Sequence, residues 1–290
     1  MNRRRFLLLS ATALAATPAR AADTVDWQGT GFGAAIALRL AGAEPQTARR
    51  SLHRVEAEIA RIQRIASLHE DSELTRLNRN GRLAGPSAAL LDLLAQAGTA
   101  HAATGGVFDP TVQPLWRALA TGGDAQAAQA AIGWDRVTVT PDEIRLDRGQ
   151  ALTLNGIAQG WAADRIAALL VAEGYGNLLI DLGEIRAQGQ RPGGGPWRAA
   201  IAGPDGAALR ETGLADRALA TSSPRGTLIG PGLPHIVGPR GEPPRWSTVA
   251  VSAPCAATAD ALSTAFCLMP AEAMIAALAA CPGARLELAA

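Results

Sequence analysis

The segment ALTLNGIAQGWAAD, residues 151–164, is the most informative part of this sequence for the fold. Residues 151–154 predict a short strand, and residues 157–173 predict a helix that ends at Gly174 or Gly176. Small residues join the two, which exposes backbone N–H groups where a phosphate would sit. The segment is neither GxGxxG nor GxxxxGK[ST], so it predicts neither a Rossmann nor a P-loop site. Taken alone, such a segment is more often a tight structural turn with no ligand.

Periodic patterns on both sides of this segment predict a mixed chain. Helices are expected where apolar residues recur every three or four positions, at 47–65, 87–103, 256–268 and 271–280. Strands are expected at 136–140 and 143–147 as a hairpin, and at 178–182, 197–202, 217–220, 248–253 and 285–288. Because helices and strands mix without a regular βαβ alternation, the fold class is α+β.

Composition excludes several classes of protein. With 48% apolar residues the chain can bury a large core, and about 269 residues after position 21 suit one large domain or two joined lobes. Without residues 1–21 the chain has 23 basic and 26 acidic residues. It therefore lacks the excess of positive charge that is typical of nucleic-acid-binding proteins. Cys255, Cys267 and Cys281 have no CxxC spacing, so neither a zinc site nor a disulfide framework is indicated, although one bridge is feasible outside the cytoplasm.

The first 21 residues predict an export signal of the twin-arginine type. Arg3-Arg4-x-Phe6-Leu7 matches the twin-arginine pattern, and the apolar stretch to Ala16 is too short to span a bilayer. Ala19-Arg20-Ala21 supplies a small-x-small cleavage site. The expectation is a periplasmic protein with no membrane span after signal removal; a retained anchor is the alternative.

Two polar loops are candidates for binding a ligand. Residues 67–78 follow a long amphipathic helix and include His69, although a capping box begun by Asp71 or Ser72 explains them at least as well. In Gly105-Gly106-Val107-Phe108-Asp109-Pro110-Thr111 the glycines permit close backbone approach, and Phe108 offers a surface to a planar ring.

Two further segments carry groups suited to phosphate chemistry. Asp260 and Thr264 are four residues apart on a predicted helix, so their oxygens share a face and suit Mg²⁺ beside phosphates. The alternative is that Asp260 is a first-turn acid that complements the helix dipole. His235 lies in a loop, where its imidazole can act as a general base near neutral pH. His53 and His101 are expected to be surface or packing residues.

Taken together, these segments resemble the ApbE family, the FAD:protein FMN transferases. The resemblance covers nearly all of the chain after the signal. The sequences of residues 154–160 and 181–185 are most similar to those of the NosX-like members, which are associated with nitrous-oxide reductase maturation. It rests, in chain order, on residues 67–78, 106–111, 155–164, 181–185, 221–223, 235–241 and 260–264. It implies an α+β flavin transferase fold in which two packed lobes hold the site between them.

The resemblance also implies a reaction, a metal and a partner. Such enzymes bind FAD and Mg²⁺, cleave the pyrophosphate, attach FMN through a phosphoester to a Thr or Ser of an exported flavoprotein, and release AMP. Phosphoryl transfer depends on positioning and charge neutralisation, which suits these segments. The implied acceptor is a periplasmic flavoprotein domain, with the nitrous-oxide reductase regulator as one candidate.

Roles follow residue by residue from the resemblance. Asp260, Thr264 and the backbone carbonyl of Gly156 would hold Mg²⁺, and His235 would deprotonate the acceptor hydroxyl. The residues expected at the flavin nucleotide are Phe32, His69, Val107, Phe108, Asp109, Thr153, Gln159 and Val237.

Three of the family's charges are missing. Thr153 stands where an acid is common, Gln159 where Lys or Glu is common, and Gly238 where Asp is common. The first two changes predict altered nucleotide affinity, and the third removes a carboxylate that would orient the His235 loop. Two alternatives therefore stand beside the transferase: an exported FAD-binding carrier that does not transfer, and an FAD pyrophosphatase that releases FMN and AMP.

Overall fold

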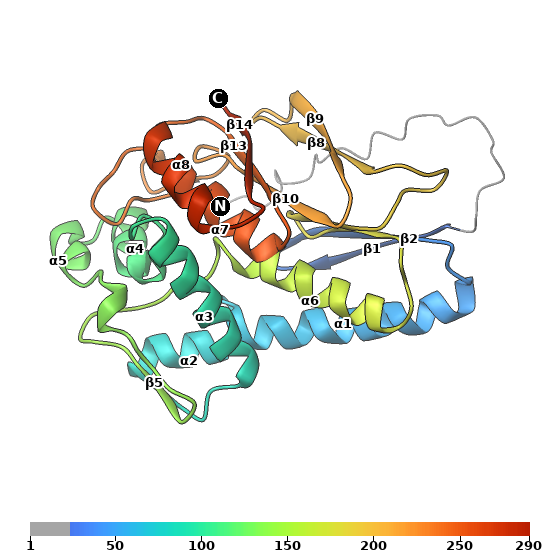
Figure 1. The fold of residues 1–290 in the computed structure, drawn as a ribbon. Coiled ribbons are helices and arrows are strands. Elements are labelled where there is room, and N and C mark those ends of the chain that lie inside the picture. The colour runs from blue at the N-terminus through green and yellow to red at the C-terminus, as the bar shows by residue number, and fades with distance from the viewer. Residues whose placement is uncertain (1–23) are drawn as a thin grey trace.

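A seven-stranded antiparallel sheet forms the body of the molecule in the computed structural model, which describes residues 24–290 (Figure 1). Its spatial order is β1-β2-β6-β7-β10-β13-β14. The strands are β1 Thr24–Gly31, β2 Ala34–Ala41, β6 Leu178–Asp181, β7 Ile185–Gln188, β10 Arg217–Ser222, β13 Val249–Ala253 and β14 Arg285–Ala289. Alternation along β2, where Ile36, Leu38 and Leu40 are buried, shows which face meets the core.

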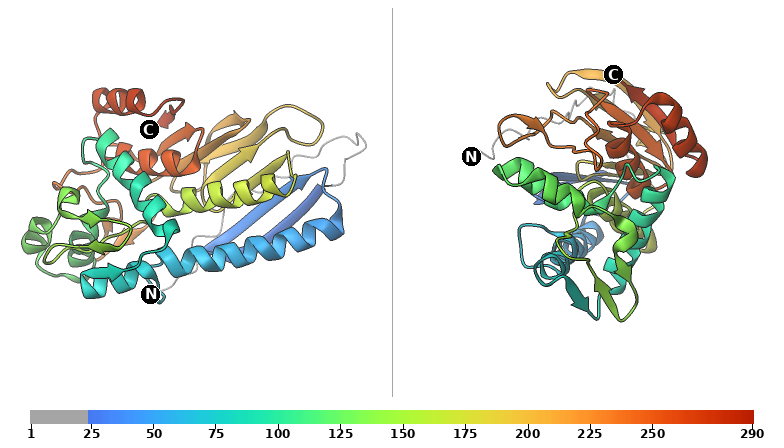
Figure 2. Two further views of the ribbon diagram at one scale, coloured as in Figure 1. Left: turned by 60° about the horizontal axis from the view of Figure 1, so that its bottom comes forward. Right: turned by 90° about the vertical axis from the view of Figure 1, so that its left-hand side faces the viewer.

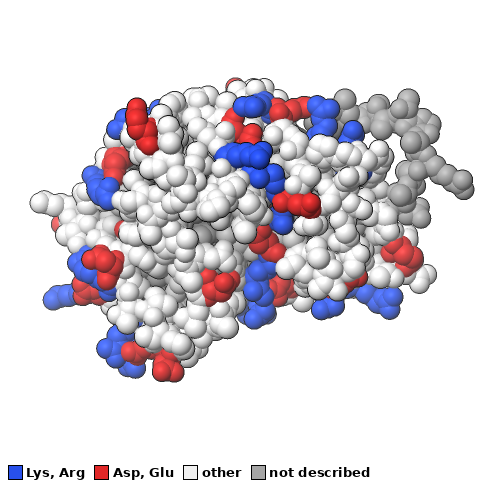
Figure 3. All heavy atoms as spheres, in the orientation of Figure 1, with Lys and Arg blue, Asp and Glu red and all other residues white. Residues whose placement is uncertain are grey.

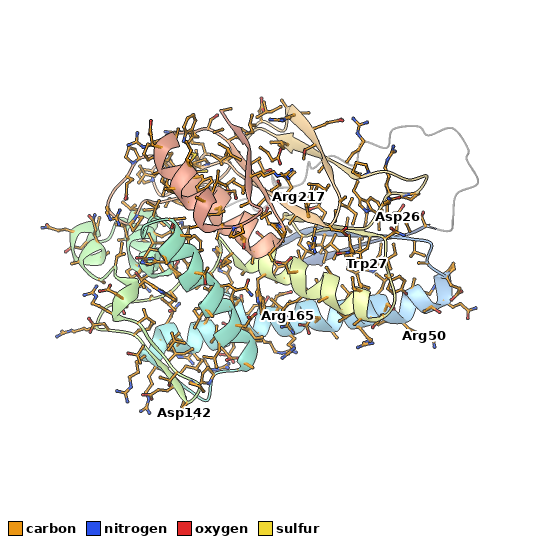
Figure 4. All side chains as sticks on the ribbon, viewed as in Figure 1. Asp26, Trp27, Arg50, Asp142, Arg165 and Arg217 are labelled. Carbon is orange, nitrogen blue, oxygen red and sulfur yellow. The ribbon has the colours of Figure 1, made fainter. Side chains whose placement is uncertain are left out.

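Three helices cover one face of this sheet. They are α1 (Pro45–Ala66), α6 (Ala158–Ala172) and α7 (Ala256–Phe266), which pack on β1, on β6 and β7, and on β10 and β13 respectively. Figure 2 shows α1 and α6 running along the blue strands at the N-terminal edge. Arg165 projects from α6 towards α1 (Figure 4), where its Nε donates to Oε1 of Glu58 at 2.7 Å. The ion pair holds the two helices side by side.

The opposite face of the sheet is covered by a hairpin. It consists of β8 (Trp197–Ala202) and β9 (Ala208–Leu214), which pair in antiparallel fashion. Trp197 and Ile201 pack there against Ala187, Leu219 and Ala250 of the sheet, in a small core of their own. This second core lies away from the α6–α7 side, so it supports the sheet without entering the site.

A group of short elements closes one end of the body (Figure 1). Its helices are α2 (Glu73–Asn80), α3 (Ala88–Ala103), α4 (Gln113–Thr121) and α5 (Ala125–Ala130), and its small sheet is β3 (Arg82–Ala84), β5 (Glu143–Arg145) and β4 (Thr138–Val139). The remaining elements are the short 3-10 helices η1 (Pro110–Val112) and η2 (Trp134–Arg136), the ribbon of β11 (Leu228–Ile229) and β12 (Leu233–Pro234), and helix α8 (Ala271–Ala280). The main hydrophobic core continues from the sheet into this end, which joins the two parts closely.

Most of the expected elements are confirmed, and one is wrong. The helices expected at 47–65, 87–103 and 157–173 are α1, α3 and α6, and the hairpin around Pro141-Asp142 is present with shorter strands. Residues 151–154 form no strand. Their backbone groups are taken by Asn78, which bonds both the N–H and the C=O of Leu152, and by Pro110, whose carbonyl accepts from Thr153 at 2.8 Å. The segment is apolar because it is buried between elements.

The expected export signal lies outside the described residues. Within residues 24–290, no helix combines the length and apolar character needed to cross a membrane. The three cysteines are free thiols. On the face seen in Figure 3, acidic and basic side chains are interspersed.

Candidate functional site

The site begins where α6 crosses α7. A Cβ at Gly160 would lie 2.3 Å from the carbonyl oxygen of Ala256, so only glycine permits this approach of the two backbones. One turn later, the Asp164 carboxylate accepts from the N–H groups of Ala256 and Ala257 at 2.9 and 3.0 Å and caps α7. The sequence of α6 thus fixes both the position and the start of α7.

Asp260 projects from α7 into this crossing. Its side chain is buried, with 4% of the residue exposed, and Oδ2 accepts from the N–H of Gly160 at 3.1 Å. Burial raises the pKa of Asp260 to about 7. The first-turn alternative for Asp260 is wrong, because α7 starts at Ala256 and has no acid in its first turn.

Thr264 and Gly156 lie together beside Asp260 on the same side of α7. A Cβ at Gly156 would lie 3.1 Å from Thr264 Oγ1 and 3.3 Å from the ring of Phe108. Ser222, at the end of β10, has its Oγ 3.5 Å from Thr264 Oγ1 and 2.8 Å from Ser263 Oγ. The expected metal residues are therefore brought together, and Ser222, from the segment 221–223, adds a hydroxyl beside them.

A second carboxylate, Glu184, comes from the turn between β6 and β7. It is 8% exposed, its carboxylate accepts from the N–H of Thr221, and its Oε2 is buried with no hydrogen-bond partner. Burial, followed by the negative charges of Asp260 and Asp181, raises the pKa of Glu184 well above its usual range. Burial also raises the pKa of Asp181. The charges of Asp260 and Asp181 thus both act on Glu184 at this end of the sheet.

Gln159 fixes the turn that carries Glu184. Its Nε2 donates to the carbonyl of Leu182 at 2.8 Å, and Gly183 adopts a φ of 99° against it. One N–H of this amide is used inside the protein, which leaves its second N–H and its Oε1 for the expected nucleotide contact. A positioning role for Gln159 is the one that the geometry supports.

The loop before α4 forms another wall of the site. Phe108 is 6% exposed with its ring beside Gly156, so it is part of the core and not the open stacking surface expected from the sequence. Asp109 Oδ1 accepts from both the N–H and Oγ1 of Thr111. Val107 is half-buried against the core. Thr153 lies against this loop through its hydrogen bond to Pro110, which connects the loop to Gly156.

A cavity of about 450 Å³ opens beside Asp109. Its lining includes His101, Gly106, Trp134 and Arg240. His101 Nδ1 contacts the Phe108 carbonyl at 2.9 Å, and Arg240 Nη2 donates to the Gly105 carbonyl at 2.7 Å. His101 is therefore more than a packing residue, because it shapes both the loop and the cavity.

His235 is held in one orientation and one tautomer. Nδ1 lies 2.9 Å from the Pro224 carbonyl and 3.2 Å from the Thr227 carbonyl. Carbonyls only accept, so Nδ1 carries the proton and Nε2 is the basic nitrogen. Burial lowers the pKa of His235, which keeps the ring neutral. Trp116 of α4 anchors the loop by donating to the His235 carbonyl at 3.0 Å.

The carboxylate that is missing at position 238 is replaced in space by that of Glu242. A Cβ at Gly238 would lie 2.6 Å from both the carbonyl oxygen and Oε2 of Glu242. Oε2 accepts from the N–H of Arg240 at 2.7 Å, which ties the loop together. Gly238 is therefore required by space, and the loop that carries His235 and the half-buried Val237 keeps a carboxylate.

Phe32 and His69 share the region near the end of α1. Phe32 occupies the β1–β2 turn at a φ of 54°, and the adjoining Gly31 packs against Ile59 of α1. His69 is exposed in the loop after α1, where Ser67 Oγ accepts from its N–H. The structure records no contact of either ring with Asp260, Thr264 or His235. For residues 67–78 the capping-box alternative is confirmed, since Ser72 and Thr75 cap α2 reciprocally.

The grouped oxygens suit a hard cation. In the described part of the chain, no three His, Cys, Asp or Glu side chains form a ready metal cage. Mg²⁺ binds typically through one or two carboxylates plus phosphates and does not need such a cage. Among the described residues, none donates a backbone hydrogen bond to the Gly156 carbonyl, because Gly160 donates to Asp260 instead. The buried, unpartnered Oε2 of Glu184 also lacks a counter-charge.

Comparison with known proteins places these features in a family. The model of the ApbE family matches residues 32–286. The FAD:protein FMN transferase of Haemophilus influenzae is 27% identical over 77% of this chain and 73% of its own length, and that of Vibrio cholerae is 29% identical over 72% and 70%.

Solved structures agree with this match. The flavin transferase ApbE from Vibrio cholerae superimposes with a TM-score of 0.78 at 26% identity, over 88% of this chain and 90% of that one. The ApbE protein of Thermotoga maritima has the same fold, with a TM-score of 0.79 at 23% identity over 92% and 96% of the two chains. The family match covers most of the sequence and includes every segment from Gly156 to Thr264, so this chain belongs to the ApbE family.

Proposed function

We propose that this protein transfers FMN from FAD to a Thr or Ser hydroxyl of an exported flavoprotein and releases AMP. The observation that carries the proposal is the convergence of Gly156, Asp260 and Thr264 at the α6–α7 crossing. Two relatives whose alignments cover 77% and 72% of this chain are named FAD:protein FMN transferase, which supports the same proposal.

Mg²⁺ is the proposed metal, held by a carboxylate oxygen of Asp260, Oγ1 of Thr264 and the carbonyl of Gly156. A bound Mg²⁺ supplies charge neutralisation on the pyrophosphate. The protein's own contribution is to hold these oxygens on α7 and on the turn just before α6, and to exclude water from Asp260, which is 4% exposed. Such positioning is the main requirement of phosphoryl transfer.

His235 is proposed to act as the general base. Its Nε2 takes the proton of the acceptor hydroxyl, whose oxygen forms a bond to the FMN phosphorus while the P–O bond to AMP breaks. The carbonyls of Pro224 and Thr227 fix Nδ1–H, which leaves the basic nitrogen available. Pro224 follows Ser222 by two residues, so one short segment links this base to Thr264.

The nucleotide is proposed to lie along the loop of Val107, Phe108 and Asp109, with further contacts from Phe32, His69 and Val237. Thr153 is expected to line the same site through its bond to that loop. The cavity beside Asp109, with Arg240 and His101 in its wall, is large enough for part of a nucleotide. Export by the twin-arginine route and a periplasmic acceptor belong to the proposal, and the nitrous-oxide reductase regulator is the specific acceptor to test.

The test is incubation of the purified protein with FAD, Mg²⁺ and a periplasmic flavoprotein domain that carries a Thr acceptor. Covalent flavin fluorescence on the acceptor in a denaturing gel supports transfer. Bound FAD without transfer indicates a flavin carrier, and free FMN with AMP indicates a pyrophosphatase. The Asp260→Ala variant is the matched control, since it removes the proposed metal carboxylate; transfer that persists in it would overturn the metal assignment.

A further inference from the structure

Glu184 is a buried acid whose charge has no partner inside the protein. With 8% of the residue exposed, water does not solvate it well, and Oε2 has no hydrogen bond. None of the ion pairs in the described part of the chain includes Asp181, Glu184 or Asp260. Arg186, two residues away, pairs with Asp164 at 3.3 Å instead. An ionised carboxylate in such a place is costly unless a cation compensates it.

The first turn of α6 holds Glu184 and Asp260 towards one another. Gln159 binds the 182–184 turn through the Leu182 carbonyl, and the next residue, Gly160, binds Asp260 Oδ2 through its N–H. Consecutive residues of one rigid helix therefore position both acids. Strand β10 contacts the same site from the other side, since Thr221 donates to the Glu184 carboxylate and Ser222 Oγ lies 3.5 Å from Thr264 Oγ1.

We propose that Glu184 serves the Asp260–Thr264 cation site as a second carboxylate, so that a divalent cation is held there by two negative charges. This inference rests on the cation site of the proposed function and deepens it. The unpartnered Oε2 supplies the reason: it is buried without a donor, on the turn that Gln159 holds next to Gly160, the residue that binds Asp260. Without a cation, two neighbouring acids repel one another, so the pair is suited to a metal.

The test is binding of Mn²⁺, measured from the electron paramagnetic resonance signal of the free ion and by competition with Mg²⁺. It uses the purified protein without FAD or acceptor. Glu184→Gln is expected to weaken Mn²⁺ binding about 10- to 100-fold, the range found when a partner of a metal site is lost. Glu184→Asp keeps the charge, so its Mn²⁺ affinity is expected to lie between those of the wild type and Glu184→Gln. The control Glu272→Gln, an exposed acid on α8, should bind as the wild type does.

Thermal unfolding in metal-free buffer separates a metal role from a structural one. Glu184→Gln is expected to melt at or above the wild-type temperature, because it removes an uncompensated acid. If Glu184→Gln binds Mn²⁺ as tightly as the wild type does, the inference is overturned. If that variant also melts at a lower temperature than the wild type, the role of Glu184 is to stabilise the β6–β7 turn. If transfer fails while Glu184→Gln still loses Mn²⁺, only the proposed function fails; if the wild type does not bind Mn²⁺ without FAD while transfer succeeds, only this inference fails.

Discussion

The backbone N–H of Gly160 donates to Oδ2 of Asp260 at 3.1 Å, at the place where α6 and α7 come closest. One glycine therefore permits the helix crossing and orients the acid of the site. Gly156 lies one turn before it, beside Thr264, and Asp164 one turn after it, at the start of α7. Gly160 and Asp164 are four residues apart on α6, so both face α7, and Gly156 lies in the turn just before α6.

Replacing Gly160 by Ala should damage stability and metal binding together. The added Cβ would lie 2.3 Å from the Ala256 carbonyl oxygen, so the helices must separate. A cost of about 1–3 kcal/mol in the free energy of unfolding is expected from such overpacking. Chemical denaturation and Mn²⁺ titration measure the two effects. Gly176→Ala is the control, because no atom lies within 4 Å of its Cβ position. Full Mn²⁺ affinity in Gly160→Ala would contradict the account.

The metal-free protein should lose stability as the pH rises from about 4 to about 7. Asp260 ordinarily has a pKa of 3.8, and burial raises it to about 7, so the folded state keeps a proton that the unfolded state releases. Each unit of raised pKa corresponds to about 1.4 kcal/mol. The raised pKa of Glu184 acts in the same direction. The lowered pKa of His235 acts oppositely below pH 6.5, so the readout is the difference between wild type and Asp260→Asn across the range.

Magnesium should stabilise the protein more at pH 8 than at pH 5, since protons compete with the metal for the same carboxylates. Thermal melting with and without Mg²⁺ at the two pH values measures this difference. Asp260→Asn should show little Mg²⁺-dependent shift at either pH. Equal stabilisation at both pH values in the wild type would mean that the cation binds elsewhere.

His235→Ala should lower kcat for transfer by about 10²- to 10⁴-fold, the usual contribution of a general base, with a smaller effect on the KM for FAD. Because burial lowers the pKa of His235, the acid limb of the wild-type pH–rate profile should lie below pH 6.5. His53→Ala, on the exposed side of α1, is the control. Retained kcat at neutral pH in His235→Ala would rule out the role.

Glu242→Ala should slow transfer without weakening Mn²⁺ binding, because it loosens the His235 loop and leaves α6 and α7 intact. The lost contact is the hydrogen bond from Arg240 N–H to Oε2 at 2.7 Å. Glu211→Ala removes an exposed ion pair with Arg198 and should change neither quantity. A Glu242→Ala enzyme with wild-type kcat would show that the loop is held by other contacts, such as Trp116.

The sequence predicts the helices well and the contacts between distant residues poorly. In α1, Leu52, Val55, Ile59 and Ile62 recur with the helical period, which is a local signal. Residues 151–154 carry an equally apolar pattern, but Asn78, 74 residues away, takes both backbone groups of Leu152, and no local pattern records that. Burial alone therefore does not distinguish a strand from an extended segment.

The site shows the same division. Asp260 and Thr264 were predictable together because four residues separate them on a helix. Glu184 was not, because its role depends on burial and on Thr221, which comes from another strand. From the sequence, Gly238 predicts the loss of an acid, but in the structure Glu242 occupies the space that a side chain at position 238 would need.

The glycines at the start of α6 also affect how a mutational scan of this protein would read. The Gly160 N–H binds Asp260, and the Gly156 carbonyl is the proposed metal ligand, so no side chain exists at either position whose removal could reveal a role. A scan would record both positions as sensitive to size, with Ala tolerated poorly and larger residues worse. An alanine scan that skips glycine would miss both of these backbone groups.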